Sequence, residues 1–153
     1  ESYEIKKELL SKIDSDIDNI YASLITLQNV RNQLNELNAR LGMEEAYTSI
    51  VDLSKKTMKL IDETESKLIS PKQKTFQDVI NFRNQLDSQL YDLLNTVNGN
   101  IPPLTGGEKV RYVDLHQKWV TIKVGVDTII DNVSEINNLL KQNSVPYISG
   151  GGK

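Results

Sequence analysis

The stretch YVDLHQKWVTIKVGVDTIIDNVSEINNLL, residues 112–140, carries the most regular pattern in this chain of 153 residues. Its apolar residues alternate steps of three and four: Tyr112, Leu115, Trp119, Ile122, Val126, Ile129, Val133, Ile136 and Leu140. That spacing is typical of a helix with a buried seam, so it predicts one long helix over residues 106–142. Five more apolar residues are expected to widen the buried stripe toward a second neighbour: Val113, Val120, Val124, Ile130 and Leu139.

The segment before this helix, IPPLTGGEKVRY (residues 101–112), fits a helix start better than a phosphate-binding loop. Thr105 and Glu108 have the spacing of a capping box, in which each side chain accepts a hydrogen bond from the other residue's backbone N–H. A Walker loop needs a glycine spacing and a Gly-Lys-Ser/Thr ending that TGGEK lacks. The residues that the sequence singles out are therefore structural: Thr105 and Glu108 as caps, and Tyr112, Leu115, Trp119, Ile122 and Val126 as the seam.

Three further segments are predicted to be helices. The first covers residues 3–41, ends at Gly42 and has its own seam: Leu10, Ile13, Ile17, Ile20, Leu24, Leu27, Val30, Leu34, Leu37 and Leu41. The second covers residues 43–69 and stops before Pro71, because proline disfavours a helical conformation in the preceding residue. The third covers residues 78–98. Residues 144–153 are expected to form a tail that is flexible toward its glycine-rich end.

These segments predict an all-α fold. Short connections make successive helices antiparallel, which favours an up-down-up-down four-helix bundle over residues 1–143. The first and last helices are predicted to be longer than the middle two. We therefore expect the start of the first helix and the end of the last to extend beyond the bundle as a two-helix pair.

The composition limits the possible classes of function. The formal net charge is −3 and the basic residues are scattered, so we expect no nucleic-acid partner. No apolar run approaches the ~20 residues that span a bilayer, and the first residues lack the apolar region of a signal peptide, so we expect no membrane insertion. The chain has no cysteine, which excludes disulfides and thiolate metal sites.

Two patterns suggest chemistry and favour a structural interpretation. DSDID (residues 14–18) resembles the start of a calcium loop, but Asn19 replaces the required glycine and Ile25 the required glutamate, so we interpret it as a solvated acidic patch. His116 is the single histidine, and no partner for it is evident, which favours a position at the helix surface or boundary. Gly125 inside a helix predicts a close approach or a bend. We predict no catalytic residue, metal site or cofactor.

Four stretches together resemble one known family. They are VRNQLNEL (30–37), NFRNQLDSQLYDLLNTV (81–97), IPPLTGGEKVRY (101–112) and INNLLKQNSVPYI (136–148). They are similar to the C-terminal helical domain that follows the β-propeller in bacterial BNR/Asp-box repeat proteins, which are described as sortilin-like or glycosyl-hydrolase-like. No Asp-box of the S-x-D-x-G-x-T-W kind occurs in these residues, so any hydrolase activity of such a parent would belong to its propeller.

The resemblance implies a non-catalytic accessory or interaction domain of a larger exported protein, at the cell surface, in the periplasm or secreted. Its partner would be the parent's own propeller or another protein. The long seams leave a second hypothesis, a self-associating coiled-coil module. A third hypothesis, a glycosidase, rests only on the description of such parents and requires two carboxylates converging in a cleft.

Overall fold

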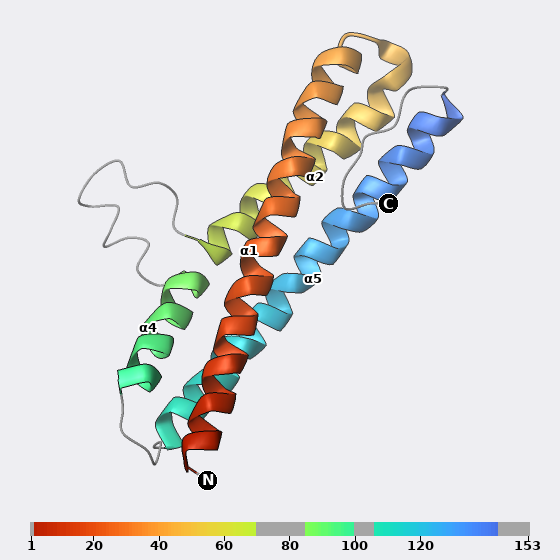
Figure 1. The fold of residues 1–153 in the computed structure, drawn as a ribbon. Helices are drawn as coiled ribbons and strands as arrows, with labels where there is room; N and C mark the ends of the chain where they lie inside the picture. The colour runs from red at the N-terminus through yellow and green to blue at the C-terminus, as the bar shows by residue number, and fades with distance from the viewer. Residues whose placement is uncertain (1, 70–84, 100–105, 144–153) are drawn as a thin grey trace, which may run out of the picture. The chain divides into compact units, whose positions relative to one another are not determined.

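The computed structural model describes residues 2–69, 85–99 and 106–143, and these residues form helices joined by turns, without a strand among them (Figure 1). The elements in chain order are α1 (Ser2–Leu41), the 3-10 helix η1 (Glu45–Tyr47), α2 (Thr48–Leu68), α4 (Leu86–Gly99) and α5 (Gly106–Gln142). The predicted all-α class is confirmed. No helix within the described ranges combines the length and apolar character needed to cross a membrane.

The second helix begins at Thr48 and not at Met43. Helix α1 ends where the Gly42 N–H donates to the Asn38 carbonyl at 2.8 Å, and a Cβ at Gly42 would lie 2.5 Å from that oxygen. Only glycine fits such a close approach, and a turn and η1 then precede α2. Residues 78–84 of the predicted third helix lie outside the described residues, and its remainder is α4.

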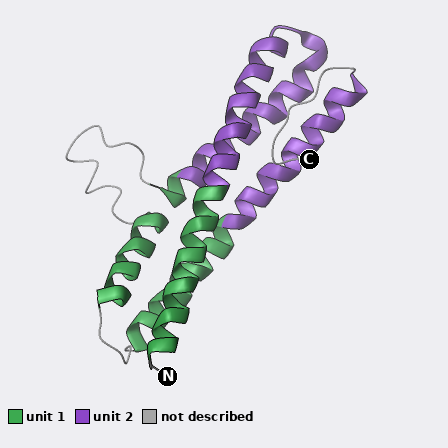
Figure 2. Cartoon of the chain, viewed as in Figure 1, with its two compact units in different colours: residues 1–22, 66–122 green, residues 23–65, 123–153 purple. Residues whose placement is uncertain are grey.

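The chain forms two compact units, and each combines two separate stretches of sequence (Figure 2). Unit 1 contains residues 1–22 and 66–122, and unit 2 contains residues 23–65 and 123–153. Helices α1 and α5 therefore contribute their first parts to unit 1 and their second parts to unit 2. Most of α2 belongs to unit 2, whereas α4 belongs to unit 1.

In unit 1, α4 runs antiparallel to α1, and α5 runs parallel to it. Lys6 Nζ donates to the Asn98 carbonyl at 3.2 Å and the Tyr21 hydroxyl donates to Asp87 Oδ2 at 3.4 Å, so the start of α1 meets the end of α4 and a later α1 residue meets the start of α4. By contrast, Asp16 meets His116, and the start of α1 shares a groove with the start of α5. The buried apolar residues of this unit are Leu9, Ile13, Ile17, Ile20, Leu68, Leu86, Leu90, Leu93, Val97, Leu115 and Trp119.

The predicted alternation of helix directions is therefore wrong in unit 1. An up-down-up-down order would make α1 antiparallel to α5 and parallel to α4. The start of α1 also shares a unit with the start of α5, and not with its end as predicted. The reason is that a seam shows which face of a helix is buried but not which helix covers it. The antiparallel rule holds only across short connections, and residues 69–85 separate α2 from α4.

Unit 2 is held by an apolar core and by one arginine. The core residues are Leu27, Val30, Leu34, Leu37, Leu41, Ile50, Val51, Ile61, Val126, Ile129, Val133, Ile136 and Leu140. Arg31 on α1 donates to Asp62 at 2.7 Å and also to Glu65, both on α2. The close approach predicted at Gly125 is confirmed, since a Cβ there would lie 3.1 Å from Thr64 Oγ1 on α2.

Candidate functional site

The residues that the sequence singled out on α5 lie at different depths. Leu115, Trp119 and Val126 are buried, whereas Tyr112 and Ile122 are half-buried. Glu108 is buried as well. Thr105 lies outside the described residues, so the capping box stays a prediction.

A polar cluster in unit 1, which we call the Asp16 cluster, joins Asp16, His116 and Tyr112. Asp16 Oδ2 lies 2.8 Å from His116 Nδ1, and the Tyr112 hydroxyl lies 3.3 Å from the same nitrogen. The Tyr112 and His116 rings stack with their centroids 5.5 Å apart. Asp16 is only 4% exposed, which corrects the interpretation of residues 14–18 as a solvated patch, although Asp14 and Asp18 are exposed.

The Asp16 carboxylate determines the proton positions in this cluster. A carboxylate can only accept, so Nδ1 of His116 carries the proton that it donates to Asp16. Burial raises the pKa of Tyr112 to about 12, and the charge of Asp16 together with a hydrogen bond to it adds to this rise. The phenol is therefore protonated at neutral pH. Such a pair can orient an imidazole for proton transfer or can fix the register of two helices.

Sequence reasoning missed this cluster, although a signal for it exists. Asp16 lies three residues after Ile13 and four before Ile20, so it occupies a position in the α1 seam. Ile17, the next residue, is buried as well and fits the same spacing, so the apolar pattern alone does not point to Asp16. A carboxylate at a seam position predicts a polar partner on the facing helix, because a buried charge without one is costly.

A groove of about 240 Å³ lies beside the cluster, between the first turns of α1 and α5. Its apolar wall contains Ile5, Leu9, Tyr112 and Val113. The remaining lining residues are charged: Glu8, Lys12 and Lys109. Lys12 also forms an ion pair with Glu8 at 3.2 Å.

The face of α5 opposite its buried seam is apolar and exposed in unit 1. Val110, Val113 and Val120 are 61%, 63% and 43% exposed. Val124, farther along α5, is exposed too, so the prediction that Val113, Val120 and Val124 widen the buried stripe is wrong. Helices α1 and α4 cover only one side of α5 in this unit. The steps from residue 110 to 113 and 120 fit a heptad in which Gln117 fills the position between Val113 and Val120, and Val113 also lines the groove beside α1.

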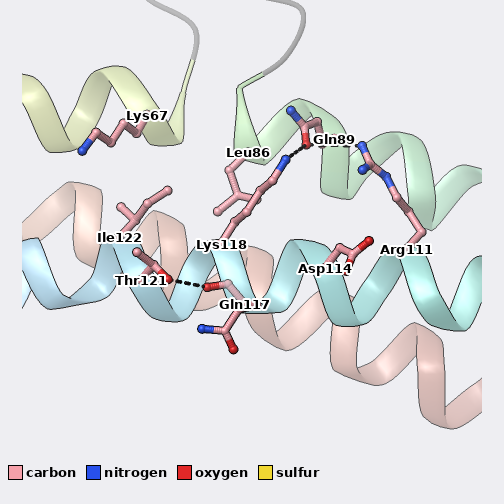
Figure 3. A pocket seen from close by; sticks show the side chains of 9 residues that line it. All are labelled: Lys67, Leu86, Gln89, Arg111, Asp114, Gln117, Lys118, Thr121 and Ile122. Carbon is pink, nitrogen blue, oxygen red and sulfur yellow. Dashed lines mark hydrogen bonds between the residues drawn. The ribbon is translucent and has the colours of Figure 1, made fainter.

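A larger pocket of about 560 Å³ lies between α4, α5 and the end of α2, within unit 1 (Figure 3). Its lining residues are Lys67, Leu86, Gln89, Arg111, Asp114, Gln117, Lys118, Thr121 and Ile122. Lys118 Nζ and Arg111 Nη2 reach from α5 to the same atom of α4, Gln89 Oε1, at 3.4 Å and 3.3 Å. The pocket thus contains three cationic side chains and one carboxylate, in a protein whose formal net charge is −3.

Two other interactions in unit 1 connect α1 with α4. The Tyr21 ring lies 6.5 Å from the Tyr91 ring, between centroids, and the Tyr21 hydroxyl donates to Asp87. Burial and the neighbouring Asp87 charge raise the pKa of Tyr21 to about 12. Burial also raises the pKa of Asp87. Within the described ranges, no group of three or more His, Asp or Glu side chains could hold a metal ion.

No family model, curated protein or solved structure matches this chain. The functional interpretation therefore depends on the residues themselves and on the four stretches quoted above. A BNR-repeat parent stays an expectation from those stretches.

Proposed function

We propose that this chain is a non-catalytic helical accessory domain that binds a protein partner, as part of a larger exported BNR-repeat protein. The observation that supports binding is the exposed valine face of α5, formed by Val110, Val113 and Val120. The parent's β-propeller is the expected partner because the resemblance implies a domain that follows a propeller. Export is part of the same proposal.

The valine face has the spacing of a second seam. Apolar residues at heptad positions of a helix are suited to pack against another helix or into an apolar groove. Lys109 and Asp114 border the valines on α5 and are exposed, whereas the exposed Gln117 occupies the position of this seam between Val113 and Val120. A polar rim around apolar residues is typical of a surface that binds another protein.

The test replaces Val113 and Val120 by glutamine, a good helix former. Both side chains are exposed, so the helix content should not change, and binding to the parent's propeller should weaken at least about tenfold if the valines are buried on binding. Ile25→Gln is the matched control, because Ile25 is 65% exposed and lies on α1 in unit 2. Equal affinity of the double variant and the wild type would contradict the proposal.

The reading frame upstream of Glu1 tests the parent. Repeats carrying Asp-boxes would support the accessory-domain proposal, and a frame without them would contradict it. This test is independent of the binding measurement. A frame without Asp-boxes, together with binding that depends on the valines, would identify a partner-binding domain of another parent.

The same valine face favours one alternative, a self-associating coiled-coil module. Two copies could bury their valines against each other. Sedimentation velocity of the wild type over a micromolar concentration series distinguishes the two. A dimer that the Val113→Gln/Val120→Gln variant abolishes supports self-association, and a monomer at all concentrations contradicts it.

A further inference from the structure

In the pocket between α4 and α5, two cationic side chains share one neutral hydrogen-bond acceptor. Arg111 and Lys118 both direct a cationic group at Gln89 Oε1, a neutral amide oxygen (Figure 3). Within the described ranges, neither cation takes part in an ion pair, although Asp114 lines the same pocket. Two cations that converge on one neutral acceptor create a position where an oxyanion would be bound more strongly.

The rest of the pocket combines charge with apolar surface. Lys67 contributes a third cation from the last turn of α2. Leu86 is buried and Ile122 half-buried, and both line the pocket beside the stem of Lys118 (Figure 3). A volume of about 560 Å³ is within the range of pockets that hold small organic molecules.

We propose that this pocket binds a small organic anion, whose carboxylate is held by Arg111 and Lys118 and whose apolar part lies on Leu86 and Ile122. The site is independent of the valine face. Gln89 acts as an internal substitute for the ligand, and its amide moves aside when a carboxylate enters. Asp114 restricts the site to ligands of low negative charge, because it repels further anionic groups.

The first experiment is an amide NMR titration of the full chain with hexanoate at constant ionic strength. Hexanol provides the apolar part without charge, hexylammonium reverses the charge, and inorganic phosphate provides an anion without an apolar part. We expect saturable shifts with hexanoate, with a dissociation constant of about 1–5 mM, confined to residues around the pocket. Absence of saturation by about 20 mM hexanoate would overturn the proposal.

The variants test the two cations and the internal substitute. Arg111→Gln and Lys118→Gln should each weaken hexanoate binding about tenfold, as expected for the loss of a charged hydrogen bond. Lys123→Gln is the matched control, because it removes one positive charge from an exposed position of α5 outside the pocket, and it should change the affinity less than twofold. Gln89→Glu places a carboxylate at the same position, so it should abolish binding without lowering the melting temperature.

Each comparison decides one part of the proposal. Equal affinities for hexanol and hexanoate would overturn the role of the cations, and equal affinities for phosphate and hexanoate would overturn the role of Leu86 and Ile122. Unchanged hexanoate binding by folded Gln89→Glu would overturn the position assigned to the carboxylate. If Lys123→Gln weakens hexanoate binding as much as Lys118→Gln does, the effect comes from the overall charge of the protein, and the proposal is overturned.

Discussion

The Asp16 cluster predicts an asymmetry between its two ends. His116→Ala removes the donor that lies 2.8 Å from the Asp16 carboxylate, and Asp16 is only 4% exposed. Asp16→Ala removes the acceptor, but the side chain of His116 is 45% exposed and can bind water instead. Losing the histidine should therefore destabilise unit 1 more than losing the aspartate.

The magnitudes follow from burial. His116→Ala leaves Asp16 with the Tyr112 hydroxyl as a partner, and the loss of one hydrogen bond to a charged group costs about 1.5–3 kcal/mol, so we expect the free energy of unfolding to fall by about 2 kcal/mol. The larger losses in stability seen when fully buried ion pairs are broken do not apply, because the His116 side chain is partly exposed to solvent. Asp16→Ala also removes the cost of burying a carboxylate, and alanine is the better helix former, so its effect should stay below about 1 kcal/mol.

The assay is equilibrium unfolding in urea, followed both by helix circular dichroism and by tryptophan fluorescence. Trp119 is the only tryptophan of the sequence and is buried in unit 1, so its fluorescence reports on the unit that contains the cluster. Gln117→Ala, at an exposed position of α5, controls for the change of helix propensity. The double variant completes the cycle, and we expect a coupling energy of about 1 kcal/mol.

Two results would refute this reasoning. One is a loss for Asp16→Ala as large as that for His116→Ala, because the carboxylate would then not depend on the histidine. The other is additivity of the two substitutions within about 0.3 kcal/mol, which would show that the contact contributes no coupling.

Three further predictions concern other contacts. Since burial raises the pKa of Tyr112 from 10.0 to about 12, the free energy of unfolding should fall as pH rises through that window, and urea unfolding across it should show a shallower fall for Tyr112→Phe. Gly125→Ala should change the melting temperature little, because the gain in helix propensity of about 1 kcal/mol is offset by crowding of the new Cβ against Thr64 Oγ1. In a Thr64→Ala background the same substitution should raise the melting temperature. Additive effects of the two substitutions would contradict the crowding. Arg31→Lys should cost about 0.5–1 kcal/mol, since lysine cannot bind both α2 carboxylates in the same way, and urea unfolding should show a smaller cost in about 1 M salt.

The helices themselves could be predicted from the sequence because periodicity is a local property. The seam from Leu115 to Leu140 predicted α5, and the buried residues of that seam lie at the predicted steps. The directions could not be predicted in this way. Which helix covers a seam depends on contacts between residues far apart in sequence, such as those of Lys6 with Asn98 and of Asp16 with His116.

The candidate sites depend even more on such distant contacts. Asp16 could have been recognised as a seam residue, but its partner lies 100 positions away. The cationic pocket has no motif, because Gln89 and Lys118 come from different helices. The exposed valines of α5 have the same local pattern as buried ones, so their exposure follows only from which side of α5 the other helices cover.

The discontinuity of the two units has a consequence for synthesis on the ribosome. Residues 1–22 are made first, but their partners in α5 extend to residue 122. At about 5–20 residues per second, residue Asp16 waits roughly 5–20 s for His116 to be translated. Unit 2 has a similar delay, because residues 23–65 share this unit with the part of α5 that begins at residue 123. Neither unit can therefore be obtained as a continuous fragment, and we expect a chain cut short before residue 106 to leave the apolar seam of α1 without α5 to cover it.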